Sequence, residues 1–290
     1  MPWKELHITT SAAHAAELSD QLSEWGALAV TFQDAGNQPI YEPSPDHPLL
    51  WQETIVTGLF EHTASLEPII NTLENQTTIK NIHPQDVPDE DWERRCLDQF
   101  KPVCFGSRLW ICPSWHALPD PQAPHVILDP GLAFGTGSHP TTALCLTWLA
   151  ENLQSGQTVI DYGCGSGILA IAALKLGAKN AIAVDHDPQA LLATQENAER
   201  NAIDSKQLIT LPANKKPLPA PDILIANILA QPLITLAPYF SSLTKTGSQI
   251  ILSGILQDQI TDIISAYTPW FVIKTPVFNE EWVRLEGIRK

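Results

Sequence analysis

Two hydrophobic periods alternate along the first 85 residues. Apolar residues recur at helical spacing at Leu18, Leu22 and Trp25, whereas the segments on either side alternate apolar and polar positions as strands do. These periods predict strands at residues 3–10, 28–32, 54–60 and 78–83, with helices before the second strand and before the fourth. The order βαββαβ is typical of a ferredoxin-like module. We therefore predict a small α+β domain at residues 1–87.

The next segment lacks a sustained period. Asp89, Glu90 and Asp91 give an acidic first turn to a helix that is expected to end near Phe100, before a proline. Short extended pieces and a proline-rich stretch follow. We predict a connector at residues 88–125.

Strands and helices alternate from Val126 onward. The apolar strands end near residues 161, 185, 211, 227 and 253, with helices between most of them. This alternation predicts a doubly wound parallel sheet. Residues 271–278 and 282–288 look like a terminal antiparallel hairpin, which is common in folds that bind S-adenosylmethionine and rare in dinucleotide folds. We predict a Rossmann-like α/β domain at residues 126–290.

Composition indicates the class of protein and its compartment. A hydrophobic content of 44% is typical of a globular chain. No apolar stretch approaches the ~18 residues that a membrane span requires, and the N-terminus lacks the pattern of a signal peptide. The five cysteines form no C-x-x-C pair, so we expect neither disulfides nor a metal site. These features predict a cytoplasmic protein.

The negative charge is concentrated in the first third. The net charge is −15, and residues 1–100 hold 4 basic and 17 acidic residues, a net of −13. Such a surface repels nucleic acid and attracts a basic partner. Charge alone is equally compatible with an acidic domain that binds nothing.

A glycine turn carries the clearest cofactor signal. The strand ending at Tyr162 runs into Gly163-Cys164-Gly165-Ser166-Gly167 and then into a helix. A dinucleotide fingerprint requires a third glycine where the chain has Ile168. Asp185 ends the next strand, where a carboxylate can accept both hydroxyls of a ribose. The pattern favours S-adenosylmethionine over a nicotinamide cofactor, although an ordinary tight turn remains an alternative.

Two further segments carry polar residues that could lie beside the expected cofactor. Asn227 ends a buried strand, and its amide can accept a hydrogen bond from an amine, or it can be satisfied within its own turn. The glycine-rich segment 128–142 is a candidate lid that opens a helix, which Ser138, Thr141 or Thr142 can cap. We interpret its His139 as a solvated loop residue rather than a catalytic base.

Three motifs together resemble a known family. LDPGLAFGTGSHPTT, VIDYGCGSGILAIAALKLGA and DILIANILAQPL follow one another behind an acidic βαββαβ module, as in the bacterial ribosomal protein L11 methyltransferase family. The resemblance covers essentially the whole chain. It implies a cytoplasmic enzyme that methylates lysine and N-terminal amines of a large-subunit ribosomal protein, up to three times each. It also implies that the N-terminal module binds that protein.

The resemblance also implies site residues. Thr142, Gly163, Asp185 and Asn227 match the S-adenosylmethionine contacts of the family, and Asn227 is expected to orient the acceptor amine. Related amine methyltransferases have prolines after this asparagine, where the chain has Ile228 and Leu229. An aliphatic amine therefore fits better than a planar glutamine or adenine amide.

Two other functions stay open at this point. One is an NAD-dependent oxidoreductase, and the other is a non-enzymatic assembly factor that holds a basic ribosomal protein. For the methyltransferase we expect no metal, no direct contact with nucleic acid or membrane, and a monomer.

Overall fold

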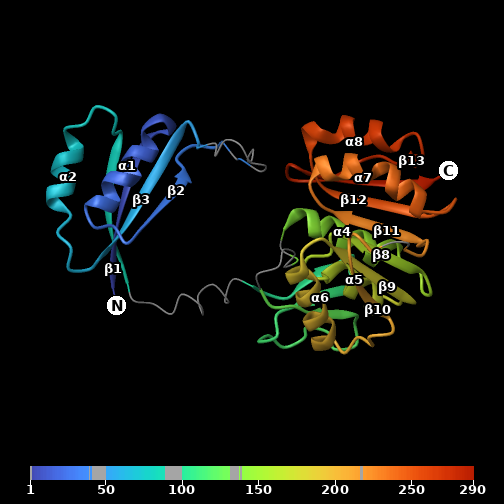
Figure 1. The fold of residues 1–290 in the computed structure, drawn as a ribbon. Coiled ribbons are helices and arrows are strands. Elements are labelled where there is room, and N and C mark those ends of the chain that lie inside the picture. Colours follow the sequence, from blue (N-terminus) through green and yellow to red (C-terminus); the bar gives the residue numbers. More distant parts are fainter. Residues whose placement is uncertain are drawn as a thin grey trace. The chain divides into compact units, whose positions relative to one another are not determined.

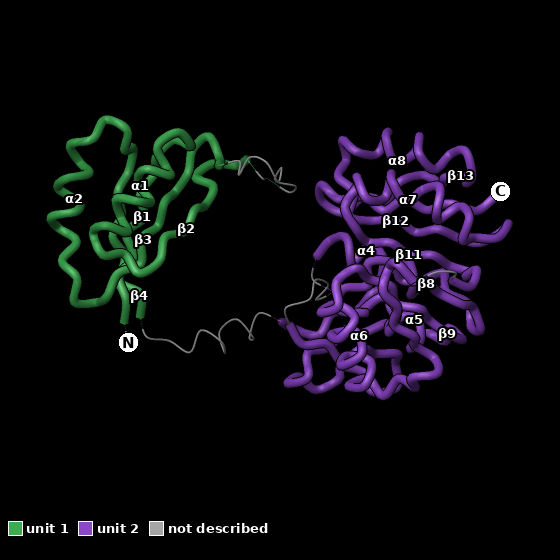
Figure 2. The backbone as a smooth tube through the Cα atoms, viewed as in Figure 1, with its two compact units in different colours: residues 1–95 green, residues 96–290 purple. Residues whose placement is uncertain are grey.

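The computed structural model describes residues 2–38, 40, 50–88, 100–130, 137, 139–215 and 218–290. The chain divides into two compact units, Met1–Arg95 and Cys96–Lys290, which we call the N-terminal and C-terminal units (Figure 2). The helix predicted from Asp89 to near Phe100 lies outside the described residues up to residue 99.

The N-terminal unit is a sheet with two helices on one face (Figure 1). Its elements are β1 (Trp3–Ser11), α1 (Ala12–Glu24), β2 (Ala29–Asp34), β3 (Glu53–Glu61), α2 (Glu67–Glu74) and β4 (Asn81–Val87). The strands are antiparallel in the order β2-β3-β1-β4, which is the strand order of a ferredoxin-like module. Ile8 and Phe60 from the sheet pack against Leu22 of α1 and Leu73 of α2 in one core.

The fourth strand lies further along the chain than the hydrophobic pattern predicts. Pattern reading ends it at His83, before Pro84, whereas β4 continues to Val87 with Pro84 opposite Leu6. β4 is an edge strand with a neighbour on one side only, so a residue without an N–H is tolerated there.

The C-terminal unit contains an eight-stranded sheet. Its strands are β8 (Thr158–Tyr162), β9 (Asn180–Asp185), β10 (Leu208–Pro212), β11 (Ile223–Asn227), β12 (Gln249–Leu256), β13 (Phe271–Ile273), β14 (Val277–Asn279) and β15 (Trp282–Arg289). The order is β10-β9-β8-β11-β12-β15-β13, and β15 runs antiparallel to its neighbours. β8 to β12 pair in parallel, as predicted for a doubly wound sheet.

Helices cover both faces of this sheet (Figure 1). They are α4 (Pro140–Asn152), α5 (Ile168–Lys175), α6 (Pro188–Arg200), α7 (Ala230–Leu243) and α8 (Ile260–Tyr267), with a short 3-10 turn at Gln257–Gln259. Neighbouring strand residues serve opposite cores: Val159 joins the core containing α4 and α5, and Ile160 joins the core containing α7 and α8.

Three short strands form a separate sheet: β5 (Val103–Phe105), β6 (Leu109–Cys112) and β7 (His125–Ile127). β6 pairs with β7 in parallel, so the predicted connector and the start of the predicted α/β domain share a sheet.

The terminal hairpin is more broken than predicted. β13 and β14 both pair with β15, but they are separated around Pro276 and are not one strand from 271 to 278. No helix in the described part of the chain has the length and apolar character needed to cross a bilayer.

Candidate active site

The predicted site residues gather at one edge of the large sheet. β8 lies between β9 and β11. The strand order runs from β8 to β9 on one side and continues with β11 on the other side, so the order of the strands reverses at β8. Gly163 follows β8, while Asp185 and Asn227 are the last residues of β9 and β11. Ligands of open α/β sheets bind in the crevice outside the strand ends at such a reversal.

The glycines of the turn are required by close packing. Gly163 has φ +82°, and a Cβ atom there would lie 2.2 Å from Cγ2 of Ile228. Gly167 has φ +77°, and a Cβ atom there would lie 2.6 Å from Cγ2 of Thr194. L-residues with side chains rarely adopt such φ values. The turn therefore fits tightly between the segment after β11 and helix α6.

Asp185 is tied to the glycine turn. Its Oδ2 accepts a hydrogen bond from the Gly165 N–H at 3.0 Å, and its Oδ1 accepts one from the Asp187 N–H at 3.0 Å. The residue is 8% exposed. Nδ1 of the exposed His186 also lies 3.3 Å from Oδ1. A carboxylate oxygen has two lone pairs, so Oδ2 keeps capacity to accept from a ribose hydroxyl.

The amide groups of the turn are already used by the chain. The N–H groups of Gly163 and Cys164 donate to the Val184 carbonyl at 2.7 and 3.1 Å. In the first turn of α5, the N–H of Ala170 donates to Oδ2 of Asp161 at 3.1 Å. A dinucleotide pyrophosphate needs such amides for itself. The turn therefore suits a cofactor without phosphate, and this geometry argues against the nicotinamide alternative.

Asp161 is a buried carboxyl under the turn. Burial raises the pKa of Asp161 to about 7, against the opposing effect of the Ala170 N–H, and nearby Asp185 raises it further. The acid two residues before the glycine turn thus caps α5 from inside the protein.

Thr142 and Asn227 meet across 85 residues of sequence. Nδ2 of Asn227 donates to Oγ1 of Thr142 at 3.3 Å, and Thr142 is 1% exposed. Oδ1 of Asn227 is buried and has no hydrogen-bond partner among the described residues. The alternative that Asn227 is satisfied within its own turn is therefore wrong. A buried acceptor of this kind costs free energy unless a ligand donates to it.

His139 differs from its interpretation as a solvated loop residue. It is the N-cap of α4, where Nδ1 accepts from the Thr141 N–H at 3.3 Å and lies 2.8 Å from Oγ1 of Thr141. Its ring packs edge-on against Trp282, with centroids 5.1 Å apart. Burial lowers the pKa of His139, and the charges of Glu280 and Glu281 oppose that shift.

The cap of α4 was also predicted on other residues. Thr141 and Thr142 lie inside the helix, and Ser138 lies outside the described residues, as do residues 131–136 of the candidate lid. The first turn of α4 is held from the sheet instead: Oγ of Ser253 lies 3.3 Å from the Thr141 carbonyl. One turn further, Nη1 of the buried Arg284 donates to the Leu144 carbonyl at 3.0 Å.

Sequence reasoning missed several polar residues that support the site. Ser253 and Arg284 hold α4, and three more lie buried on α6 or at its C-cap: Thr194, Asn197 and Asn201. The one available signal was polar residues at positions 194, 197 and 201, a helical spacing that would normally mark an apolar face.

The fold and the crevice together define a class. A parallel sheet ending in an antiparallel strand, with a carboxylate beside a glycine turn whose Gly163, Cys164 and Gly165 amides are bound within the chain, defines an S-adenosylmethionine-dependent methyltransferase.

Comparison with known proteins gives the family within this class. The model of the ribosomal protein L11 methyltransferase (PrmA) family matches residues 2–290. The chain is 50% identical over 293 residues to the ribosomal protein L11 methyltransferase of Nitrosococcus oceani, with 100% of both chains covered. It is 49% identical over 296 residues to the protein of the same name from Marinobacter nauticus, covering 100% of this chain and 99% of that one.

A solved structure agrees. The ribosomal protein L11 methylase from Lactobacillus delbrueckii subsp. bulgaricus matches with a TM-score of 0.60 and 32% identity, covering 66% of this chain and 98% of that chain. The chain belongs to the ribosomal protein L11 methyltransferase family.

Proposed function

We propose that this methyltransferase acts on lysine and N-terminal amines of ribosomal protein L11. The names of its relatives supply the substrate. The observation that carries the amine chemistry is the buried, unpartnered Oδ1 of Asn227 beside Thr142. An amide oxygen there accepts a hydrogen bond from an attacking nitrogen.

Four residues are proposed to hold the cofactor. S-adenosylmethionine supplies a methyl group on a positively charged sulfur. Asp185 accepts the ribose hydroxyls, because its carboxylate lies at the turn and Oδ2 has a lone pair left beside its bond from Gly165. Gly163 allows the backbone to approach closely, and Thr142 and Asn227 flank the reacting end.

Asn227 is proposed to orient the acceptor. Its Nδ2 is engaged by Thr142, so rotation of the amide is restrained and Oδ1 keeps one direction. A free lysine amine has a pKa of ~10.4 and must lose a proton before it attacks. Desolvation and a nearby positive charge both favour the neutral amine, so water can carry the proton away. Alignment is then the main task of the residues.

The N-terminal unit is proposed to capture the substrate through its helical layer. Helices α1 and α2 carry five acidic residues and no lysine or arginine: Glu17, Asp20, Glu24, Glu67 and Glu74. A ribosomal protein that binds RNA is basic, so the charges are complementary.

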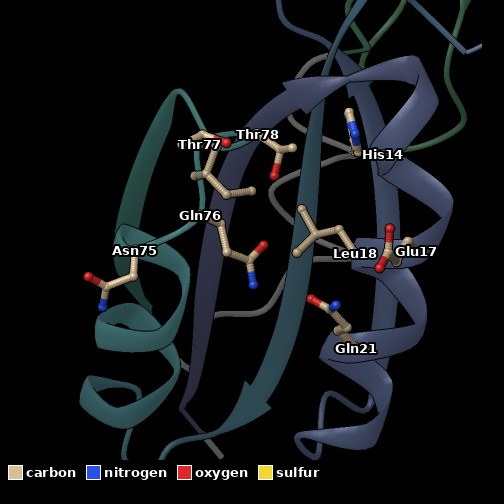
Figure 3. A pocket seen from close by; sticks show the side chains of 9 residues that line it. His14, Glu17, Leu18, Gln21, Asn75, Gln76, Thr77 and Thr78 are labelled. Atoms are coloured by element: carbon tan, nitrogen blue, oxygen red, sulfur yellow. The ribbon is translucent and has the colours of Figure 1, made fainter.

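A groove lies within this layer. It has a volume of about 490 Å³ between one stripe of α1 and residues 75–79. Figure 3 shows Leu18, Gln21 and Gln76 reaching into it. The side-chain amides of both glutamines offer a donor and an acceptor, which suits the backbone of a peptide segment. We propose that a basic segment of the ribosomal protein occupies this groove, with Glu17 as its charge partner.

The catalytic proposal is tested by incubating the protein with labelled S-adenosylmethionine and purified L11, followed by mass spectrometry. We expect added methyl groups on lysine or N-terminal amines. Tight binding of L11 without transfer would instead support the assembly-factor alternative.

The groove is tested by charge neutralisation. Glu17→Gln within the groove should raise KM for L11 and weaken its salt dependence, with kcat unchanged. The matched control is Glu24→Gln, an exposed residue of the same helix outside the groove. An equal effect in both variants would assign the attraction to overall charge and remove the groove from the proposal.

A further inference from the structure

Helix α6 presents polar side chains to the protein interior. Thr194 and Asn197 on the helix and Asn201 at its C-cap follow one another at helical spacing and are 0%, 9% and 3% exposed. Buried polar groups are costly unless they are hydrogen-bonded, so their partners indicate their purpose.

Two of these residues donate hydrogen bonds to the glycine turn. Oγ1 of Thr194 donates to the Gly165 carbonyl at 3.0 Å, and Nδ2 of Asn197 donates to the Ser166 carbonyl at 2.9 Å. Both successive carbonyls of the turn are therefore bound to α6. The N–H of the same Gly165 donates to Asp185. The two peptide units that follow this contact are therefore held in place by α6.

The third residue forms hydrogen bonds with β7. Oδ1 of Asn201 accepts from the Ile127 N–H at 2.7 Å, and its Nδ2 donates to the Ile127 carbonyl at 2.8 Å. Asn201 thus pairs with Ile127 as a neighbouring strand would. Arg200 adds a link, with Nη1 lying 3.2 Å from Oδ1 of Asn197 and 3.4 Å from Oδ2 of Asp129.

We propose that Thr194 and Asn197 are positioning residues for S-adenosylmethionine. They hold two successive carbonyls of the glycine turn on α6 and act on the cofactor through the turn and Asp185, while Asn201 at the C-cap holds β7 on the end of the same helix. This inference rests on the cofactor site proposed above. Loss of one of these hydrogen bonds leaves a turn carbonyl without its partner, so its peptide unit can rotate. The Gly165 contact with Asp185 is then misaligned.

Substitutions at Thr194 separate the hydrogen bond from packing. Thr194→Val keeps the shape and removes the donor, whereas Thr194→Ser keeps the donor. Calorimetry with S-adenosylhomocysteine should show about tenfold weaker binding for Thr194→Val, the effect of one buried carbonyl left unsatisfied. Binding by Thr194→Ser should stay close to that of the unmodified chain.

The matched control is Gln195→Ala on the same helix. Nε2 of Gln195 donates to Oγ1 of Thr210 at 2.6 Å, away from the turn. We expect this variant to keep its affinity, and Thr194→Val to raise KM for S-adenosylmethionine but not KM for L11. Unchanged affinity in Thr194→Val, or equal weakening in Gln195→Ala, would overturn the inference.

Asp185→Ala distinguishes this failure from that of the site itself. If Asp185→Ala weakens binding and Thr194→Val does not, the positioning role alone is wrong. If neither weakens binding, the proposed cofactor site is also wrong.

Discussion

The two units of the chain bury polar groups in different ways. The described part of the N-terminal unit buries three threonines and no charged side chain. Each hydroxyl has a partner nearby: Thr10 donates to Thr78, Thr54 donates to Trp51, and Thr57 contacts His7. Its described charged side chains lie outside the core, where charges can act at a distance.

The C-terminal unit buries charges at the edge of its sheet. Asp161, Asp185 and Arg284 are all buried there, together with Thr142. Burying a charge is costly unless it is paired or hydrogen-bonded, and a well-packed apolar core would avoid that cost. The difference teaches that the C-terminal unit buries charged residues where the cofactor site is proposed, while the N-terminal unit keeps its charged residues out of the core, as the proposed substrate capture requires.

The largest expected effect is on turnover, from Asn227→Ala. Removing the acceptor should raise the barrier by roughly 2 to 4 kcal/mol, with less change in cofactor affinity. Steady-state kinetics and calorimetry measure the two separately. Asn227→Asp should keep measurable activity with a pH profile shifted to alkaline values, because a carboxylate stabilises the protonated amine. Normal turnover in the alanine variant would reduce Asn227 to a structural residue.

The buried charge of Asp161 predicts a pH dependence of stability. The folded chain holds this proton more tightly than the unfolded chain, since burial raises the pKa of Asp161 from 3.8 to about 7. Its contribution is therefore complete below about pH 4 and is lost as the pH rises towards 7. Asp161→Asn should flatten the free energy of unfolding over this range by up to about 4 kcal/mol.

Denaturant unfolding at several pH values measures this effect. Glu17→Gln on the exterior of the N-terminal unit is the control and should leave the profile unchanged. An Asp161→Asn profile parallel to that of the unmodified chain would contradict the assignment.

Glycine substitutions compare backbone packing in the two units. Gly163→Ala forces Cβ against Ile228 at positive φ and should destabilise the fold by roughly 2 to 4 kcal/mol. Ile228→Ala removes the atom in the way, so the double variant should lose less than the sum of the single variants. Gly58→Ala in the N-terminal unit has no positive φ to overcome and meets only side-chain atoms, Cε2 of Phe60 at 2.9 Å and Cδ1 of Leu22 at 3.4 Å, so it should cost less.

Those free energies come from denaturant titrations of the four variants and the unmodified chain. If the changes in the free energy of unfolding caused by the Gly163 and Ile228 substitutions are strictly additive, the close approach of Ile228 does not explain the glycine at position 163.

A smaller effect is expected on cofactor affinity. Asp185→Ala should weaken S-adenosylmethionine binding by roughly 1 to 3 kcal/mol, because hydroxyls lose a charged acceptor. Asp187→Ala is a suitable control, since Asp187 caps α6 by accepting from the Gln189 N–H at 2.8 Å. Calorimetry that finds both variants equal to the unmodified chain would refute the ribose assignment.

Much of the fold follows from local patterns. The predicted strand ends at Asp185 and Asn227 match the structure to the residue, because a polar side chain follows an unbroken apolar run at each. The break in the hairpin and the extension of β4 through Pro84 were missed, since each depends on which neighbour a strand has.

The support of the site was less predictable. Thr194 and Asn197 occupy a helical spacing that normally marks an apolar face, and only the folded turn supplies the carbonyl partners that explain them. Thr142 and Asn227 were named from family resemblance, and their contact joins segments 85 residues apart. Side-chain periodicity carries no information on such long-range pairs.

The division of labour between the units is tested most directly by deleting residues 1–87. The account predicts that the remaining chain binds S-adenosylhomocysteine with unchanged affinity and methylates a short lysine peptide as the full chain does. Its kcat/KM for intact L11 should fall roughly tenfold to a thousandfold, the range expected when electrostatic capture is lost. Full activity on intact L11 at sub-saturating concentration would contradict the account.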